Sequence, residues 1–493
     1  MSRGGVLALC AALLLLLPLS ASAAERTGPD RGDRIGAAEA TAAADRDAEV
    51  VEQSRLHPGL TSSANMVDGR WEVGYFADSE QVALAIVDPL DGEVLESWTG
   101  YQVAWKMARG YSGSFGHKLN APYVFLPLCA VFLLGLVDWR RPRRIANLDL
   151  LVLLGFAVSH YFFNRAQIGV SVPIVYPLLL YLFGRGLWIG FRGRGEGLRP
   201  VWPATWLLIA ALFLVGFRVG LNVADSGAID VGYAGVVGAD RISHGEQLYD
   251  NFPEDVSQGD TYGPLNYWAY LPSEAIWPWS GSWDDLPAAH GAAVLFDLAT
   301  FALLIVLGRR IRPGPSGRGL AATLAFGWAA FPYTAYVLES NSNDALVSLL
   351  LVATLLALAR PFGRGFLAAL ATLTKFAPVL LAPMLLTHRA TRRSLTAFAF
   401  AFLLTVALLM LWPAVDPGLH TFYERTISYQ ADRDSPFSLW GQVDALAPVR
   451  TAILIGVACL ALALAIWPRH KTLTQLAALG AALLLGAQLV AEH

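Results

Sequence analysis

The sequence predicts a polytopic all-α membrane protein, a helical bundle that carries a small α+β domain near its N-terminus. Hydrophobic residues make up 55% of the 493 positions and charged residues only 15%, more than one soluble core requires. Apolar runs of nearly membrane-spanning length recur through the chain, and arginine clusters follow every second run. The net charge of -3 leaves no basic surplus for a phosphate backbone, so no nucleic-acid partner is expected.

Residues 1–23 have the features of a secretory signal peptide. Arg3 precedes an apolar run over residues 6–19, and Ala21-Ser22-Ala23 is a small-residue cleavage pattern. A chain processed there would begin outside the cytoplasm. The alternative is an uncleaved first membrane helix, which the run disfavours because it is shorter than the ~20 residues that a span needs.

Residues 24–118 have a soluble composition and predict an extracytoplasmic α+β domain. Residues 37–56 are rich in Ala and Glu and indicate a helix. Strands are expected at residues 71–77, 81–88 and 93–101. This arrangement resembles the PepSY-like modules of secreted and membrane proteins. The stretch gathers no His, Cys or carboxylate ligand set, so we expect a docking or regulatory module rather than a metal site.

The remainder, residues 119–493, is expected to form the multi-pass membrane domain. Arginines cluster after the first, third, fifth and seventh apolar runs and mark the cytoplasmic side. About ten full crossings follow, at residues 122–139, 148–163, 170–191, 202–221, 292–307, 320–338, 345–359, 395–412, 445–467 and 474–490. The two large loops, residues 222–290 and 413–444, then lie outside together with the N-terminal domain.

The stretch 365–394 breaks this alternation. A single crossing there would leave the basic run 388–393 outside and invert the rest of the chain. Lys375, with Pro378 and Pro383 behind it, favours two half-helices that dip into the membrane and return to the same side. We prefer this re-entrant pair over the single crossing, and we expect Lys375 to belong to the cytoplasmic-side structure.

The external loop 222–290 is the long carboxylate-rich insertion among the apolar runs. Asp230 stands out because it lies shortly beyond an apolar run. An amphipathic pattern follows it and predicts a short helix along the membrane interface, carried by Val231, Ala234, Val237 and Ile242. A carboxylate held there can take a proton from a hydroxyl group that arrives from outside. The alternative is a solvated loop residue, the ordinary state of any one carboxylate.

The segment AIDVGYAGVVGADRISHGEQLYDN, with GDTYGPLNYW after it, resembles the first external loop of the GT-C glycosyltransferases. The closest resemblance is to glycosyltransferase family 87, whose members use polyprenyl-phosphate-linked mannose. In that family an early Asp is the catalytic base, and a Gly, a Tyr and a Tyr-Gly-Pro element follow. The matching positions are Asp230, Gly245, Tyr249 and Tyr262-Gly263-Pro264.

The resemblance extends through much of residues 200–493. The turn at 339–344, the half-helix pair at 365–394 and the late loop YQADRDSPFSLWG are similar to family features. The resemblance therefore implies that Tyr262, Asn343 and Asp344 bind substrate. The family pattern usually continues beyond the position of His493, which indicates a truncated reading frame or a fragment.

Three arginines are candidates for binding a lipid phosphate. Arg425 and Arg433 lie on the second external loop, where they either pair with the phosphate or anchor the chain at the interface. Arg218 lies near the outer end of its run and must be paired, snorkel or face the phosphate. Asp260 either assists the base or binds a divalent cation, or it forms the turn beside Gly259. No other cofactor is expected.

The resemblance implies an inverting glycosyltransferase of the cell membrane. It would transfer a sugar, in the first instance mannose, from a polyprenyl-phosphate donor to an extracytoplasmic lipid or glycan acceptor, with Asp230 as general base. Membrane lipids are its expected surroundings. Two other classes stay open: a non-catalytic scaffold or sensor that works through the N-terminal domain, and a transporter, which the few intramembrane charges and the lack of a visible inverted repeat disfavour.

Overall fold

The computed structural model describes residues 34–67, 69–78, 80–113, 117–193, 197–433 and 435–491. The chain divides into two compact units, Met1–Ala104 and Trp105–His493, and each is described by itself. The predicted signal peptide at residues 1–23 lies outside the described part of the chain.

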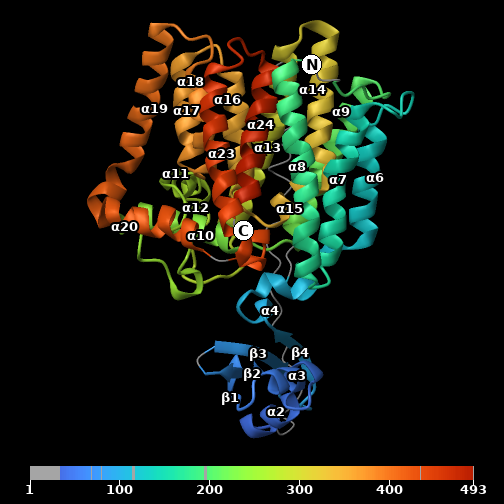
Figure 1. The fold of residues 1–493 in the computed structure, drawn as a ribbon, viewed down its shortest axis with the longest axis vertical. Helices are drawn as coiled ribbons and strands as arrows, with labels where there is room; N and C mark the ends of the chain where they lie inside the picture. The colour runs from blue at the N-terminus through green and yellow to red at the C-terminus, as the bar shows by residue number, and fades with distance from the viewer. Residues whose placement is uncertain are drawn as a thin grey trace. The chain divides into compact units, whose positions relative to one another are not determined.

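The first unit packs two helices against a four-stranded antiparallel sheet of order β1-β2-β3-β4 (Figure 1). Its elements are α2 (Ala37–Ala44), α3 (Ala48–Leu56), β1 (Thr61–Val67), β2 (Arg70–Ala77), β3 (Glu80–Val87) and β4 (Val94–Thr99). The three predicted strands are present. The strand β1 was not predicted, because as an exposed edge strand it lacks a buried alternating face.

The single helix predicted at residues 37–56 is two helices. The first ends at Ala44, and Asp47 caps α3, since its carboxylate accepts hydrogen bonds from the backbone N–H groups of Glu49 (3.0 Å) and Val50 (3.4 Å). Small and β-branched side chains form the core between helices and sheet, among them Ala40, Ala44, Val50, Val73 and Ala85. The Ala-rich helix composition thus lets α2 lie close to the strands.

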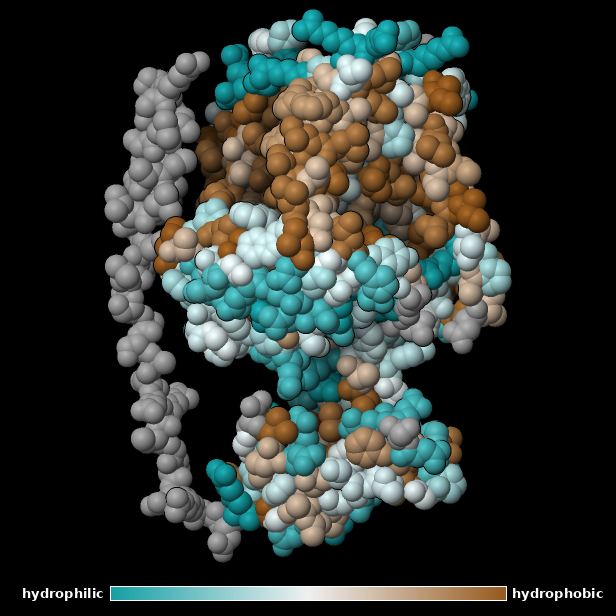
Figure 2. All heavy atoms as spheres, turned by 90° about the vertical axis from the view of Figure 1, so that its left-hand side faces the viewer, coloured by the Kyte–Doolittle hydropathy of each residue, from teal (hydrophilic) through white to brown (hydrophobic). Residues whose placement is uncertain are grey.

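The second unit is helical, and seven of its described helices are long and apolar enough to cross a membrane. They are α7 (Ile145–Phe163), α8 (Ile168–Arg192), α9 (Ala204–Asp225), α13 (Pro287–Ile311), α19 (Arg392–Pro413), α23 (Ala447–Ile466) and α24 (Leu473–Val490). Figure 2 shows a band of apolar side chains over this unit, with polar side chains at its ends. The bundle has the surface of a membrane protein.

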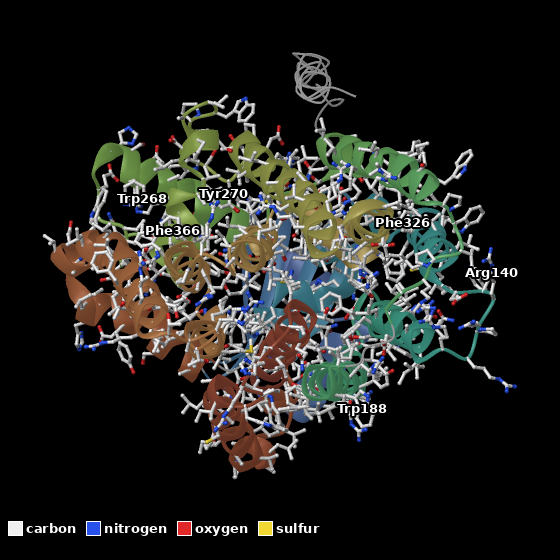
Figure 3. All side chains as sticks on the ribbon, turned by 90° about the horizontal axis from the view of Figure 1, so that it is seen from above. Arg140, Trp188, Trp268, Tyr270, Phe326 and Phe366 are labelled. Atoms are coloured by element: carbon white, nitrogen blue, oxygen red, sulfur yellow. The ribbon has the colours of Figure 1, made fainter. Side chains whose placement is uncertain are left out.

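The other three predicted crossings correspond to shorter helices, and that they cross stays a prediction. They are α6 (Pro122–Leu136), α14 (Gly314–Ala330) with α15 (Pro332–Glu339), and α16 (Asp344–Leu356). The run predicted at 320–338 is divided because Pro332 cannot donate a backbone hydrogen bond to the end of α14. Seen along the helices in Figure 3, Arg140 and Trp188 lie at the edge of this unit.

The stretch 365–394 contains short helices, in agreement with the predicted half-helix pair. They are α17 (Pro361–Thr372), η3 (Ala377–Leu381) and α18 (Ala382–Leu386), and the turn 373–376 joins them. The helix α17 packs closely on α19, because at Gly365 an added Cβ would lie 2.4 Å from the Phe398 carbonyl oxygen. The tip of the half-helix pair faces the loop between α9 and α13.

That loop contains α10 (Asp230–His244), η2 (Glu254–Val256), α11 (Pro264–Trp268) and α12 (Leu271–Glu274). The predicted short helix after Asp230 is therefore present. Its predicted exposed face is not, because every residue from Gly232 to Ala239 is buried. Three glycines allow this burial, since the Tyr270 ring lies against Gly235, the Tyr267 ring lies against Gly238, and Gly232 contacts backbone.

Candidate functional site

The candidate site begins at Asp230, the first residue of α10. Its side chain is exposed, and one of its oxygens accepts a hydrogen bond from the Val231 N–H at 2.9 Å. In the described part of the chain no cation forms an ion pair with Asp230, so this carboxylate can accept a proton. A carboxylate in the first turn is also stabilised by the helix dipole.

The turn over residues 339–344 holds the start of α10 in place. The Ile229 N–H donates to the Ser340 carbonyl at 3.1 Å, and the Asn341 side chain donates to the Gly227 carbonyl at 3.2 Å. A Cβ at Gly232 would lie 2.4 Å from the Asn341 carbonyl oxygen, so only glycine allows this approach. Asp344 ends the same turn, which therefore brings the two carboxylates Asp230 and Asp344 to one end of the bundle.

The Tyr262-Gly263-Pro264 element binds the tip of the half-helix pair through its backbone. The Gly263 N–H donates to the Thr374 carbonyl at 3.3 Å, and the Leu265 N–H donates to the Leu373 carbonyl at 3.0 Å. A Cβ at Gly263 would lie 2.1 Å from the Leu373 carbonyl oxygen. The glycine in this motif is thus required by a backbone contact.

Charged groups from separate segments surround Tyr262. Lys375, at the tip of the half-helix pair, forms an ion pair with Asp344 and lies 5.8 Å from the centre of the Tyr262 ring. Burial raises the pKa of the Tyr262 phenol above its usual value; the negative charges of Asp230 and Asp344 raise it further, and Arg433 opposes them. The Asp344–Lys375 pair therefore lies beside the Tyr262 ring, and Asp230 and Arg433 are close enough to act on it electrostatically.

Lys375 is a correction to the sequence analysis, which assigned it to the cytoplasmic-side structure. The lysine lies in the turn between α17 and η3 and pairs with Asp344, next to the candidate site. Its ammonium group is stabilised by Asp344, 31 residues earlier in the sequence. A lysine inside an apolar run was the available signal, and its partner could be found only from the fold.

Buried polar atoms next to this cluster lack a partner among the described residues. They are the Tyr270 hydroxyl, the Asn266 amide nitrogen and the Asn343 amide oxygen. The two amides are joined by one hydrogen bond, from Asn343 Nδ2 to Asn266 Oδ1 at 2.6 Å. Unsatisfied buried groups are costly, so they mark a place where a polar ligand can bind. Sequence analysis found Asn343 but missed Asn266 and Tyr270, which no motif singled out.

Asp260 and Arg425 pair with each other. The guanidinium donates to both carboxylate oxygens of Asp260, at 2.7 and 2.8 Å, and Asp260 also accepts from the Asp250 N–H at 2.7 Å. Asp260 is fully buried, so it is not available to bind a cation or to assist a base. The expected substrate roles of Asp260 and Arg425 are replaced by a structural one, a clamp between the two loops.

Arg218 also has a structural role rather than the expected phosphate-binding one. It is 1% exposed and donates to Asp297 at 2.8 Å and to the Trp328 carbonyl at 2.8 Å. Asp297 in turn accepts from the Trp328 indole N–H at 2.9 Å. A buried arginine with these partners cannot turn toward a lipid phosphate. Asp297 is therefore a buried polar contact within the bundle.

Arg433 remains a candidate for binding an anion. Its guanidinium lies over the rings of Trp105 at 4.9 Å and Tyr429 at 5.8 Å, and none of the described residues forms an ion pair with it. Its Nε is buried without a hydrogen-bond partner among the described residues. Arg433 acts on Tyr262 electrostatically, which places its charge at the candidate site.

No group of three or more His, Cys, Asp or Glu side chains that could hold a metal ion occurs among the described residues. Among the described residues, the site consists of the unpaired Asp230 carboxylate, the Asp344–Lys375 ion pair and the Arg433 guanidinium, which lies over aromatic rings. The buried amides of Asn266 and Asn343, each with one unsatisfied atom, complete it. These groups suit acid-base chemistry on a polar substrate that carries a negative charge.

The second unit is thus a multi-pass helical membrane protein with a charged site at the loop ends of its helices. Residues 261–491 match the family model of glycosyltransferase family 87. This match supports a membrane glycosyltransferase of that family, and it covers Tyr262, Asp344, Lys375 and Arg433 but begins after Asp230. A search of the curated proteins found no match.

Proposed function

We propose that this protein is an inverting membrane glycosyltransferase. It transfers a sugar, with mannose as the first candidate, from a polyprenyl-phosphate donor to an extracytoplasmic lipid or glycan acceptor. The observation that supports this most is the Asp344–Lys375 ion pair beside the Tyr262 ring, with Asp230 and Arg433 close enough to act on the same phenol electrostatically. The family match over residues 261–491 agrees with that reaction class.

In the proposed reaction Asp230 is the general base. Its carboxylate takes the proton of an acceptor hydroxyl, and the hydroxyl oxygen forms a bond to the anomeric carbon of the donor. The bond between that carbon and the phosphate oxygen breaks on the opposite face, and the polyprenyl phosphate leaves with the electron pair. Asp230 is exposed and unpaired among the described residues, which leaves its oxygens free for this transfer.

The cations of the cluster act on the leaving phosphate. Among the described residues Arg433 contacts aromatic faces and forms no ion pair with a carboxylate, so its guanidinium N–H groups can bind phosphate oxygens. Lys375 orients Asp344 and adds positive charge where negative charge develops. The unsatisfied polar groups of Asn266, Asn343 and Tyr270 are suited to sugar hydroxyls.

The test is sugar transfer in membranes that contain the full chain, with radiolabelled polyprenyl-phosphate-mannose as donor and endogenous acceptors. Asp230→Asn is expected to lower transfer by roughly 10²–10⁴-fold, the usual contribution of a general base. Asp285→Asn serves as the matched control, because Asp285 is an exposed carboxylate of the same loop.

Transfer by the native chain and by Asp285→Asn but not by Asp230→Asn would support both the reaction and the base. If Asp230→Asn retains native transfer at equal membrane abundance, another group is the base. If neither the native chain nor the control transfers label from any of several polyprenyl-phosphate sugars, the scaffold or sensor class takes the place of the enzyme.

A further inference from the structure

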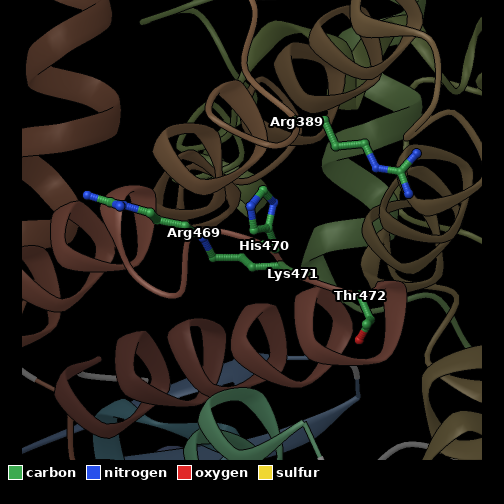
Figure 4. Close-up of a pocket in the computed structure, with 5 residues that line it drawn as sticks. All are labelled: Arg389, Arg469, His470, Lys471 and Thr472. Carbon is green, nitrogen blue, oxygen red and sulfur yellow. The ribbon is translucent and has the colours of Figure 1, made fainter.

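A second polar feature lies where α18 and α19 adjoin the connection between α23 and α24. There a cavity of about 220 Å³ is lined by Arg389, Arg469, His470, Lys471 and Thr472. Figure 4 shows Arg389 coming from a segment far from the other four residues in the sequence, which are consecutive. Three of the five side chains, those of Arg389, Arg469 and Lys471, are basic, and none of the described residues that line the cavity is a carboxylate.

Three arginines with little exposed side-chain surface pair with carboxylates in this unit. Arg218 pairs with Asp297 at 2.8 Å, and Arg185 pairs with Asp149 at 3.0 Å. The same holds for Arg144, which is 2.9 Å from Asp138. This pattern follows from the cost of removing a charge from water without compensation.

Arg364, beside the cavity, departs from that pattern. It is 1% exposed, and its guanidinium donates only to backbone carbonyls, those of Leu358 at 2.6 Å and His388 at 3.4 Å. Its Nε has no partner, and no carboxylate pairs with it in the described part of the chain. The residue whose carbonyl it contacts directly precedes Arg389 of the cavity.

Lys471 adds a second buried cation. It is 8% exposed, its ammonium donates to the Pro468 carbonyl at 2.6 Å, and burial lowers its pKa below the usual value. Arg364, Arg389 and Lys471 all act electrostatically on the same side chain, His388, which shows that their charges are close together. Among the described residues no carboxylate pairs with Arg364 or Lys471, so an anion bound here would lower the repulsion between these charges.

We propose that this cavity binds a phosphate group, either that of an anionic phospholipid or free phosphate. Two arginines and a lysine provide several donors, and the guanidinium fork matches phosphate oxygens. The surrounding helices α19, α23 and α24 are apolar and of membrane-spanning length, so their ends lie where lipid headgroups gather. The site is separate from the Tyr262 cluster and does not depend on the proposed reaction.

The experiment measures ligand binding to the purified full chain in a neutral detergent. Phosphatidylglycerol, phosphatidylcholine and inorganic phosphate are added in turn, and the bound lipid is counted by native mass spectrometry while melting temperature is followed. The test variant is Arg389→Gln with Arg469→Gln, both exposed residues whose replacement leaves the bundle core intact. The control is Arg392→Gln with Arg393→Gln, which removes two equally exposed charges nearby.

Phosphatidylglycerol is expected to bind more strongly than phosphatidylcholine and to raise the melting temperature. The cavity variant should weaken that binding about tenfold, since each lost contact is a charge-assisted hydrogen bond, whereas the control variant should not. Lysine at positions 389 and 469 should restore most of the binding, because the charge returns.

The two sources give different results. If inorganic phosphate stabilises the native chain and phosphatidylglycerol adds nothing, and the cavity variant abolishes the effect, the ligand is free phosphate. If neither ligand binds, or if the control pair weakens binding as much as the cavity pair, the cavity is not a phosphate site and the proposal fails.

Discussion

Asp344, the first residue of α16, forms an ion pair with Lys375 at the tip of the half-helix pair. The two side chains are 31 residues apart in the sequence and remain about half-exposed or less, with 47% and 31% of their surface accessible. Their contact joins the turn over residues 339–344 to the segment that binds the Tyr262-Gly263-Pro264 element. The pair therefore connects three of the segments that form the candidate site.

This pair predicts a non-additive mutational pattern. Asp344→Asn and Lys375→Gln should each lower the melting temperature, because each leaves one charge without its partner. The double variant should lose less than the sum, with a coupling of about 1 kcal/mol, as for a partly exposed ion pair. Thermal unfolding of the four proteins in detergent measures this coupling, and strictly additive losses would show that the pair does not stabilise the fold.

The same pair predicts an effect on activity. Exchange of the charges, Asp344→Lys with Lys375→Asp, should recover most of the stability but leave sugar transfer at least about tenfold below native. The reason is that the cation would then point from α16 rather than from the half-helix tip, away from its place near the leaving phosphate. Native transfer by the exchanged protein would mean that only the ion pair matters.

Gly263 predicts a steric effect on the site. In Gly263→Ala the new methyl group would lie 2.1 Å from the Leu373 carbonyl oxygen, and backbone must move to admit it. We expect a destabilisation of roughly 1–3 kcal/mol and a loss of transfer, because Tyr262 would move away from Lys375. The matched control is Gly220→Ala in α9, where a Cβ would meet nothing within 4 Å. Equal melting temperatures for the two variants would contradict this packing.

The Asp260–Arg425 clamp predicts a large loss of stability when one partner is removed. Arg425→Ala should cost roughly 3–5 kcal/mol, since it leaves a fully buried carboxylate unpaired. Asp260→Asn combined with Arg425→Gln should cost less than Arg425→Ala, because no charge is then left buried. The comparison is Glu424→Gln, which removes an exposed pair with His420 and should change stability by less than about 1 kcal/mol.

Were Arg425 instead a phosphate ligand, Arg425→Ala would reduce donor binding while stability stayed close to native. Donor KM and melting temperature, measured on the same preparations, separate these two roles. If Arg425 belongs to the clamp, the melting temperature of the Arg425→Ala protein must be lower than that of the native chain.

His388 predicts a stability that falls in mild acid. Burial, together with the positive charges of Arg364, Arg389 and Lys471, lowers its pKa from 6.5 to about 4. Between these two values the unfolded chain binds a proton that the folded chain does not, so stability is lost as pH falls from 6.5 toward 4. The slope is at most about 1.4 kcal/mol per pH unit.

The measurement is melting temperature against pH in a phosphate-free buffer. His388→Asn should remove part of the decline below pH 6.5, because asparagine does not titrate. His470→Asn replaces an exposed histidine of the same end and should keep the native profile. Identical profiles for the native chain and His388→Asn would show that this imidazole is not the group responsible.

Periodicity and charge placement were enough to find the helices. The apolar runs and the arginines between them located seven long helices, and Lys375 with two prolines indicated the half-helix pair. These features can be predicted from one segment at a time, because the length of an apolar run, its hydrophobicity and its prolines determine the structure of that same segment. The edge strand β1 was missed for the same reason, since its local pattern carries no buried face.

The sequence did not show which charged residues pair with each other. Arg218, Arg425 and Arg433 were equal candidates for a phosphate, yet two of them are occupied by carboxylates that lie 79 and 165 residues away. Lys375 was expected in the cytoplasmic-side structure and not beside the candidate site, because nothing near it in the chain identifies Asp344 as its partner. Long-range pairing of charges depends on which helix ends meet.

The sequence by itself therefore determined the class of fold, the positions of the seven long apolar helices and of the short helices around Lys375, and the loop that holds Asp230. The tertiary structure decided which charges are neutralised inside the bundle and which remain free around Tyr262. The physical reason is that hydrophobic patterning is read along one segment, whereas the cost of a buried charge is offset only by groups that other segments bring to it.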